Sequence, residues 1–332
     1  MLSRPLVRVL AVSFVLLLAA VIWFVLQVSP IGGQGREEYV TVNPGASLSA
    51  IAGEMHAEGV IGSPLAFRID TVLFGAPTVR VGTYGIRQNS SFAQVKSILG
   101  GPPNVVAVAP LMTLHEVAVT GVASAKGDAF ANSFVADAVA AAAQNAYHPA
   151  SSLEGLIGAG DYVLAPGETP MELLGQMTSS FARQAASVGL SPSTTLNGLN
   201  AYQLIIAASI TQEEGYYPFN MPKVARVIFN RLAQGGHLQM DGTVCYTQGQ
   251  LGCQVTPAML LVAGPYNTYT INGLTPTPIC TVSTSALKAV LHAPPGPWLY
   301  FVLVTKSGTM KFSSTWAGQL KAEKLAQERG VG

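Results

Sequence analysis

The sequence predicts an α+β protein with one N-terminal transmembrane helix, a small α+β module and a larger mixed α+β domain. An uncharged apolar run near the N-terminus is long enough to cross a membrane. A strand–helix–helix–strand pattern follows, and the rest of the chain alternates helical patterns with polar loops. The 332 residues leave room for about two domains beside the anchor. The expected divisions are a stub and anchor at 1–35, the module at 36–103 and the large domain at 104–332, with an intermediate lobe at 104–190 and a core at 191–332.

The N-terminal run predicts a retained anchor. No charged residue falls between Arg8 and Arg36, and residues 9–28 supply about the 20 apolar residues that a bilayer requires. Arg4 and Arg8 precede the run, so the positive-inside rule places the N-terminus in the cytoplasm and the remainder outside the cell membrane, as a single-pass protein. A cleaved signal peptide is the alternative, although the run is long and no small-x-small cleavage site follows it closely.

The composition excludes several classes of function. The net charge is +1, so no basic surface for nucleic acid is expected. The five histidines are scattered, without metal-ligand spacing to a cysteine or to each other, so no metal site is predicted. The sequence contains no Gly-rich phosphate-binding motif and no Gly-x-Ser-x-Gly motif. We therefore expect no cofactor and no nucleic-acid partner.

The small module is predicted from two strands, each followed by capped helices. Tyr39, Val40 and Val42 alternate as in a strand, and residues 80–87 form the second strand pattern. Serines are expected to cap the three helices, and glycines to end the first and last of them. The caps are Ser47, Ser63 before Pro64, and Ser90 or Ser91; the buried positions are Leu48, Ile51, Ala52, Met55, Phe92, Val95 and Leu99; the stops are Gly59, Gly100 and Gly101.

The intermediate lobe has less distinctive patterns. Residues 128–145 predict an Ala-rich helix. A turn at Pro166-Gly167 is expected before a helix that buries Met171, Leu174 and Met177. The carboxylates of this lobe, Glu154 and Asp161, are expected to be structural or to lie at a rim.

The most informative stretch is 204–241, where an apolar helix pattern ends in Glu213 and Glu214. Glu214 shares a helical face with the apolar Ile210, and burial there would raise its pKa toward that of a general acid. Glu213 shares that face almost as well. For both residues the alternative to a buried general acid is a carboxylate exposed to solvent at the helix end. A second helix is expected from an N-cap at Asn220 to a stop at Gly235, with Val224, Val227, Ile228 and Leu232 on its buried face.

The three cysteines lie in the last third of the chain. Cys245 and Cys253 bracket a short polar loop with two glycines, and the expected compartment permits disulfides. We expect a Cys245–Cys253 disulfide, with Cys280 free and buried. Pairing of Cys245 with Cys280, or three free thiols, are the alternatives.

Several blocks of the chain resemble, in the same order, motifs of the endolytic murein transglycosylases of the YceG-like (MltG) family. Ala208-Ser209-Ile210 with Glu214 resembles the helix motif ASIVEKE. Further blocks are 229–232 (FNRL), 238–246 (LQMDGTVCY), 265–270 (PYNTYT), 273–279 (GLTPTPI), 285–292 (SALKAVLH) and 299–302 (LYFV), with weaker copies at 82–84 and 153–162. The resemblance spans about 39–320, and the small module looks like a LysM-like module. Gln212 replaces the first acid of ASIVEKE, Met310 and Lys311 replace a His-Thr pair, and the block at 153–162 lacks a proline.

The resemblance implies an enzyme that cleaves peptidoglycan strands between N-acetylmuramic acid and N-acetylglucosamine. One carboxyl group, Glu214, would act as both acid and base, and the products would end in 1,6-anhydro sugars. The implied partners are peptidoglycan strands, nascent ones included, the membrane and cell-wall synthases. An inactive glycan-binding anchor or scaffold of cell-wall synthesis is the alternative.

Neutral polar and aromatic side chains suit a sugar groove, because sugar hydroxyl and N-acetyl groups need neutral hydrogen-bond partners. Asp241 is expected either to act on substrate or to order its loop through backbone amides. Arg231 is expected to pair with the Glu214 helix or to lie on the helix surface. The substrate-binding candidates are Asn230, Arg231, Gln239, Asp241, Thr243, Tyr266, Asn267, Thr268 and Tyr269.

Overall fold

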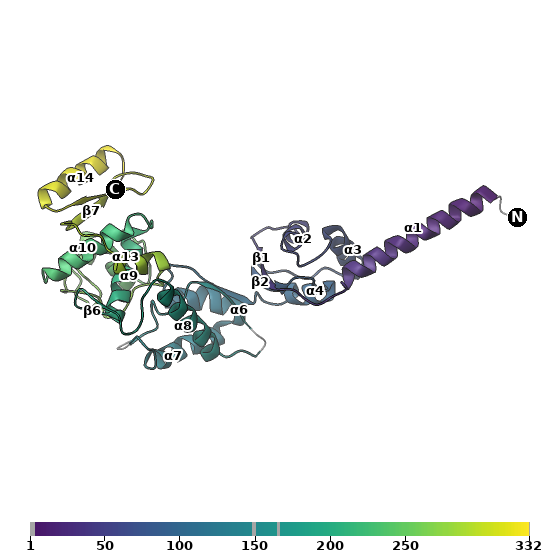
Figure 1. Ribbon diagram of the computed structural model, residues 1–332, viewed down its shortest axis with the longest axis horizontal. Helices are drawn as coiled ribbons and strands as arrows, with labels where there is room; N and C mark the ends of the chain where they lie inside the picture. Colours follow the sequence, from purple (N-terminus) through teal and green to yellow (C-terminus); the bar gives the residue numbers. More distant parts are fainter. Residues whose placement is uncertain (1–3, 148–150, 165–166, 332) are drawn as a thin grey trace. The chain divides into compact units, whose positions relative to one another are not determined.

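The computed structural model describes residues 4–147, 151–164 and 167–331 and confirms an α+β fold (Figure 1). The chain divides into two compact units. The first comprises Met1–Val106, Ser124–Lys126 and Val163–Pro166, and the second comprises the remainder.

The N-terminal helix α1 (Arg4–Val28) contains an 18-residue window, Ala11–Val28, with a mean hydropathy of 2.6. This helix is long and apolar enough to cross a membrane, a property that it shares with signal sequences. Its last turns belong to the first unit, since Phe24 and Val28 pack against the core of the module.

The module in the first unit has the order β1 (Glu37–Val42), α2 (Leu48–Ala57), α3 (Pro64–Phe74), β2 (Gly82–Arg87) and α4 (Phe92–Gly100). The two strands are antiparallel, with Glu37 opposite Arg87 and Val42 opposite Gly82. The expected serines cap the helices: Ser47 accepts from Ala50 N, Ser63 from Ala66 N, and Ser91 from Gln94 N within a capping box. Ser91, not Ser90, is thus the third cap.

The next segment contains β3 (Val105–Val108), α5 (Leu114–Glu116), a π-helical turn η1 (Val117–Val122), α6 (Ala123–Lys126), α7 (Asp128–Ala142), β4 (Gly160–Val163) and α8 (Pro170–Ser187). Leu174 and Met177 are buried on α8, as expected. Met171 is exposed, because it lies in the first turn at the edge of the buried stripe. The expected turn at Pro166 falls outside the described residues.

The core of the second unit is a helical group around α9 (Ala201–Gly215). α9 packs against α10 (Met221–Ala233) and α13 (Thr284–Leu291), which also contact each other (Figure 1). Short elements surround the group: β5 (Thr195–Leu196), β6 (Leu199–Asn200), α11 (Asp241–Thr247) and α12 (Pro257–Leu260). Asn200 caps α9 in a capping box with Gln203, and nearly every α9 residue is buried. The helix is therefore a rigid support for the carboxylates at its end.

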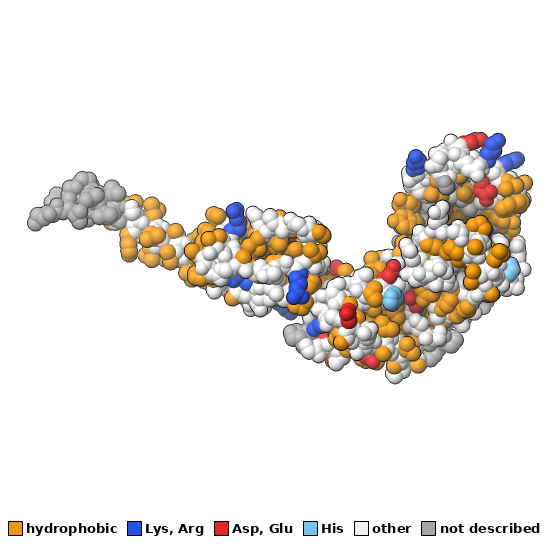
Figure 2. Space-filling model, turned by 180° about the vertical axis from the view of Figure 1, so that it is seen from behind, with side chains coloured by type: hydrophobic (Ala, Val, Ile, Leu, Met, Phe, Trp, Pro, Cys, Tyr) orange, Lys and Arg blue, Asp and Glu red, His pale blue; other side chains and the backbone are white. Residues whose placement is uncertain are grey.

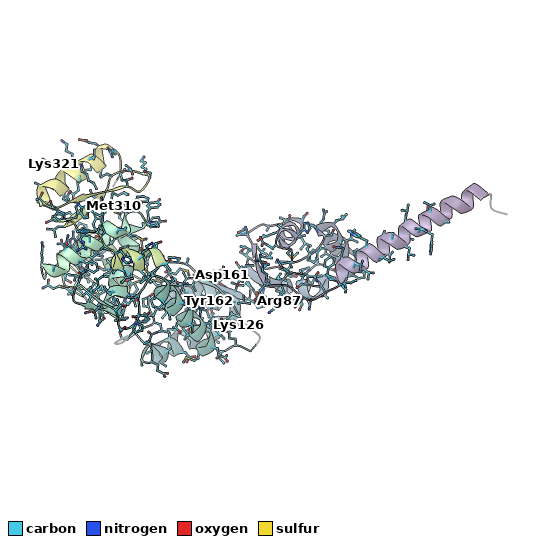
Figure 3. The ribbon with its side chains drawn as sticks, viewed as in Figure 1. Arg87, Lys126, Asp161, Tyr162, Met310 and Lys321 are labelled. Carbon is cyan, nitrogen blue, oxygen red and sulfur yellow. A yellow bond between two sulfur atoms is a disulfide. The ribbon has the colours of Figure 1, made fainter. Side chains whose placement is uncertain are left out.

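The C-terminal part is a hairpin of β7 (Tyr300–Leu303) and β8 (Met310–Ser313) that packs against α14 (Trp316–Glu328). Figure 3 labels Met310 on β8 and Lys321 on α14. Thr315 caps α14 by accepting from Gly318 N.

Asn220 occupies the N-cap position of α10, but its side chain makes no capping hydrogen bond, contrary to expectation. Pro222, near the start of α10, has no N–H to donate, which removes one possible capping partner. The buried Asn220 amide instead donates to Gly215 O at 3.3 Å and to Gly308 O at 2.8 Å. These bonds connect the turn between α9 and α10 to the C-terminal hairpin. Gly235, with φ +67°, follows the end of α10 as expected.

Candidate active site

The carboxyl group of Glu214 lies at the C-terminal end of α9, half-buried, and faces the start of α11. Its Oε1 accepts a hydrogen bond of 2.9 Å from the backbone N–H of Gly242. Burial raises the pKa of Glu214 to about 8, the charges of Asp241 and Glu213 add to the rise, and the Gly242 bond and Arg231 oppose it. Glu214 is therefore mainly protonated at neutral pH, as a general acid must be.

The adjacent carboxylate has a different partner. Glu213 Oε1 accepts from Gly252 N at 2.8 Å. Burial raises the pKa of Glu213 as well, while the Gly252 bond lowers it. The side chain passes so close to Gly242 that a Cβ added there would lie 2.3 Å from Glu213 Cγ. Glu213 thus binds the loop beyond α11, and Glu214 binds the start of α11.

Asp241 is exposed at the first position of α11. Its Oδ1 accepts a hydrogen bond of 2.6 Å from the hydroxyl of Tyr269. Burial and this carboxylate raise the pKa of Tyr269. Through this side-chain contact Asp241 joins α11 to the loop at 265–270.

Thr243, Asn267 and Thr268 are buried and bonded within the protein. The hydroxyls of Thr243 and Thr268 lie 2.9 Å apart, and Met240 N donates to Thr268 Oγ1 at 3.0 Å. The Asn267 amide donates to three backbone carbonyls, those of Met259, Leu260 and Val262. The expectation that these three side chains contact sugar is not supported, because their polar groups hold the loops together.

Gln239 and Tyr266 are more accessible. Gln239 is exposed, with φ +51°, and its N–H donates to Thr268 O at 3.0 Å. Tyr266 is half-buried, and its hydroxyl lies 2.8 Å from Thr277 Oγ1. Gln239, Asp241 and the half-buried Tyr269 form the accessible polar edge of this region.

Two adjacent polar residues of α10, Asn230 and Arg231, bind backbone carbonyls, most of them in the segment before β7. The Asn230 amide donates to Gly296 O at 2.9 Å and to Trp298 O at 2.8 Å. Arg231 donates to the carbonyls of Leu299 and Leu238, and its guanidinium lies 5.7 Å from the ring centroid of Tyr300.

Arg231 is thus neither a surface arginine nor a hydrogen-bonded partner of Glu214 in the described contacts. Its positive charge still lowers the pKa of Glu214. Both Asn230 and Arg231 connect α10 to the chain before the hairpin, so their expected contact with substrate is not supported either.

Glu154 is buried and structural, as the sequence suggested. Its two oxygens accept from Leu114 N at 3.0 and 3.1 Å, and Tyr246 on α11 donates its hydroxyl at 3.2 Å. Burial raises the pKa of Glu154 to about 7, against the effect of these hydrogen bonds. The ring of Tyr246 also contacts that of Tyr266, at 4.9 Å between centroids. Asp161, in contrast, is exposed on β4 (Figure 3).

The structure contains the Cys245–Cys253 disulfide, with Cα atoms 5.5 Å apart, and leaves Cys280 free and buried. The bridge joins α11 to the loop whose Gly252 N–H binds Glu213. It therefore restrains both of the backbone segments that hold the carboxylate pair.

A non-reducing peptide map is expected to show one cross-linked pair, with Cys245 joined to Cys253. Replacing both cysteines by serine is expected to lower the free energy of unfolding by about 2–3 kcal/mol, because closing this short loop constrains the unfolded chain. Denaturant titration of the oxidised wild type and the double variant measures the difference. A cross-linked peptide containing Cys280, or three thiols open to alkylation, would contradict this assignment.

A group of exposed aromatic side chains was missed from the sequence. Tyr216, Tyr217 and Phe219 lie two to five residues after Glu214 and are 59%, 40% and 61% exposed. The rings of Tyr217 and Phe219 stack with centroids 5.4 Å apart and an interplanar angle of 11°. The sequence signal for them was the run YYPF shortly after the two glutamates, because a simple turn does not need three aromatic side chains. We call these three residues the aromatic platform.

No group of three or more His, Cys, Asp or Glu side chains with metal-binding geometry occurs in the part of the chain that the structure describes. The chemistry that the arrangement can support is proton transfer by the half-buried Glu214 beside an accessible polar edge and aromatic rings.

Comparisons with known proteins agree with the resemblance seen in the sequence. Residues 40–324 match the model of the YceG-like family. A Bacillus subtilis (strain 168) protein named endolytic murein transglycosylase is 35% identical over 135 residues, covering 41% of this chain and 36% of the relative. A protein of the same name from Streptococcus pneumoniae serotype 2 is 24% identical over 318 residues, covering 84% of this chain and 56% of the relative.

The chain thus spans between about one third and just over half of these curated relatives. Among solved structures, the yceG-like protein lmo1499 from Listeria monocytogenes has the same fold, with a TM-score of 0.58 and 23% identity over 86% of this chain and 99% of that one. Because the family model covers most of the chain, this protein belongs to the YceG-like family.

Proposed function

We propose that this protein is an endolytic lytic transglycosylase that cleaves peptidoglycan strands and leaves 1,6-anhydromuramic ends. The observation that carries the proposal is the half-buried Glu214, whose raised pKa keeps a proton available at neutral pH. The names of the relatives from B. subtilis and S. pneumoniae support the substrate class. A glycan-binding scaffold without activity is the second candidate, and it would not require a protonated Glu214.

A single carboxyl group suffices for this reaction. The Glu214 O–H donates its proton to the glycosidic oxygen while the bond from that oxygen to the muramic C1 breaks. The 6-hydroxyl of the same sugar then bonds to C1, and its proton passes to the Glu214 carboxylate. No water is consumed, and Glu214 ends in its starting state. A retaining hydrolase would need a second carboxylate as nucleophile, whereas the nearby Asp241 is hydrogen-bonded to Tyr269.

We propose that the glycan lies along the accessible edge formed by Gln239, Asp241 and Tyr269 and over the aromatic platform. Sugar faces pack on aromatic rings, and exposed polar groups bind hydroxyls. Tyr266, with the buried Thr243, Asn267 and Thr268, supports this edge from behind.

The N-terminal helix supports a location at the membrane. We propose that α1 is retained as a single-pass anchor, with the N-terminus in the cytoplasm and a LysM-like module at 36–103 outside. The large domain at 104–332 would then face the cell wall and act on nascent strands beside the synthases.

Mass analysis of products from purified peptidoglycan tests the reaction. The full-length protein in detergent is expected to release fragments with 1,6-anhydro ends. Reducing ends would show a hydrolase, and binding without cleavage would show the scaffold. Either result would refute the transglycosylase.

The pH profile is expected to show Glu214 as an acid. Activity is expected to be full while Glu214 is protonated. It is expected to fall as the pH rises through about 8, the pKa of Glu214 in the folded protein. Asp241→Asn removes a charge that raises this pKa, so the falling limb is expected to move to lower pH. Rates of cleavage between pH 5 and 10 measure both, and an unmoved limb would show that another group controls it.

The aromatic platform is expected to contribute to binding. Phe219→Ala is expected to raise KM by about threefold to tenfold, because aromatic packing contributes about 0.5–1.5 kcal/mol beyond burial. The matched control is Leu320→Ala on α14, which removes another exposed apolar side chain. Equal effects of the two substitutions on KM would argue against the platform.

A further inference from the structure

The module in the first unit has an apolar face that nothing in the chain's described part covers. The inner face of α3 is buried through Ala66, Phe67, Asp70 and Thr71. Five further side chains of α3 are apolar and exposed. The intervals between successive ones are four, three, one and one residues, which places most of them on one side of the helix. They are Leu65 (60% exposed), Ile69 (37%), Val72 (85%), Leu73 (63%) and Phe74 (68%). We call this set the α3 apolar face.

Single exposed apolar side chains are common on soluble proteins, but here four, Leu65, Ile69, Val72 and Leu73, share one side of an 11-residue helix, and Phe74 ends it. A helix with one buried face and one apolar outer face is suited to a partner that is itself apolar. The position of the face identifies that partner.

α3 lies beside the last turns of α1, with which it is in contact (Figure 1). Phe24 and Val28 of α1 pack against the core to which Phe67 of α3 belongs. Gln27 lies close to Gly62, two residues before α3, since a Cβ added to Gly62 would lie 2.4 Å from Gln27 Oε1. The module is therefore seated directly on the end of the apolar span.

This packing sets the depth of α3 relative to a bilayer. An apolar helix of about 20 residues, with a rise of 1.5 Å per residue, crosses a hydrocarbon core of about 30 Å. If residues 9–28 occupy the core, Phe24 and Val28 lie near its outer boundary. A helix that packs on those residues lies at the level of the lipid headgroups.

Exposed basic residues lie close to the face in the sequence. Arg68 on α3 and Arg80 shortly after it are exposed, and basic residues beside an apolar face favour anionic lipids. Figure 2 shows hydrophobic side chains on the surface of the module as well as along α1.

We propose that the α3 apolar face rests in the outer leaflet of the same bilayer that α1 crosses, with phospholipid as its partner. This rests on the proposed membrane anchor. The module is then held at two points, the span and the interfacial helix, which prevents it from swinging freely about the end of α1.

Depth-dependent fluorescence quenching tests the proposal. The full-length chain, with its disulfide intact and Cys280 buried, is reconstituted into vesicles of phosphatidylethanolamine and phosphatidylglycerol. An environment-sensitive fluorophore is attached in turn to Leu17→Cys in α1, Val72→Cys on the α3 apolar face and Ala57→Cys, an exposed position on α2. Lipids with a quencher near the headgroup or at mid-chain report the depth of each label.

The label at Val72 is expected to be quenched most by the headgroup quencher, that at Leu17 by the mid-chain quencher, and that at Ala57 by neither. A quenched Leu17 with Val72 as unquenched as Ala57 would overturn the interfacial helix and leave the anchor in place. An unquenched Leu17 would overturn the anchor, and the interfacial helix with it. Equal quenching at Val72 and Ala57 would indicate general adsorption and would also refute the proposal.

A second variant checks that the apolar side chains cause the contact. With the label moved to Leu65→Cys, the added substitutions Val72→Ser and Phe74→Ser are expected to reduce quenching severalfold. Both positions are exposed, so the fold of the module is expected to remain. Unchanged quenching would assign the contact to another part of the module.

Discussion

Replacing Glu214 by Gln is expected to remove detectable cleavage while leaving the fold intact. General acid–base groups contribute about 10²- to 10⁴-fold to rates, and here one group makes both proton transfers. Glutamine has the shape of the protonated carboxyl group that predominates below a pKa of about 8. Product release from purified peptidoglycan and thermal unfolding at pH 7 measure the two effects.

The matched control is Glu213→Gln. Its carboxylate binds Gly252 N on the loop beyond α11, so most of the activity is expected to remain. Reversed phenotypes would place the acid at Glu213.

Stability gives a separate check on Glu214. A carboxyl pKa that is higher in the folded than in the unfolded state stabilises the fold at low pH, and this contribution is lost as the pH rises through the folded pKa. For Glu214 the loss is expected as the pH rises toward and through about 8. The Gln variant lacks this group, so its unfolding free energy is expected to fall less than that of the wild type over this range.

Gly242→Ala is expected to lower kcat by about tenfold to a hundredfold. The added Cβ would lie 2.3 Å from Glu213 Cγ, so the Glu213 side chain or the start of α11 must shift. We expect α11 to move and its N–H to leave Glu214 Oε1. The loss of a hydrogen bond to a carboxylate costs about 1.5–3 kcal/mol. Because that bond lowers the pKa of Glu214, its loss is also expected to move the falling limb of the pH profile to higher pH.

Gly236→Ala is the control for this substitution. Gly236 has no neighbouring atom within 4 Å of an added Cβ and lies in the loop after α10. Activity close to wild type is expected. If both variants lose activity equally, or if the pH limb of Gly242→Ala stays in place, the hydrogen bond does not control Glu214.

The small module was predictable because its signals are local. Ser47 and Ser63 each cap a helix that begins at the next residue, and the apolar positions alternate with the period of the element that they occupy. The choice between Ser90 and Ser91 needed the structure, since either serine could precede the helix.

The carboxylate pair was found from the sequence, where periodicity did not separate Glu213 from Glu214 and only the family resemblance pointed to Glu214. Both residues follow an apolar helix with nearly the same periodicity. Gly242 and Gly252, which distinguish them, lie 28 and 39 residues further along the chain. Backbone donors leave no pattern of residue types, so periodicity could not assign these partners.

The internal partners of several sugar-binding candidates were hidden from the sequence for a related reason. Thr243 and Thr268 have the chemistry that a glycan needs, yet their hydroxyls bond to each other across 25 residues. Residue type shows what a side chain can bind but not whether the protein already occupies it. Arg231 is a similar case, because its partners are backbone carbonyls.

The Asn220 contact has a consequence for the order in which the protein folds. Its amide joins the turn between α9 and α10 to Gly308, which lies 88 residues after Asn220 in the chain. A chain that emerges from the ribosome N-terminus first can form α9 and α10 well before the hairpin exists, because their contacts are nearer in sequence. The hydrogen bond from Asn220 must wait for residue 308, and closing so long a loop adds an entropic cost that the docked hairpin must offset. The turn behind Glu214 therefore gains this native contact late, after most of the chain has left the ribosome.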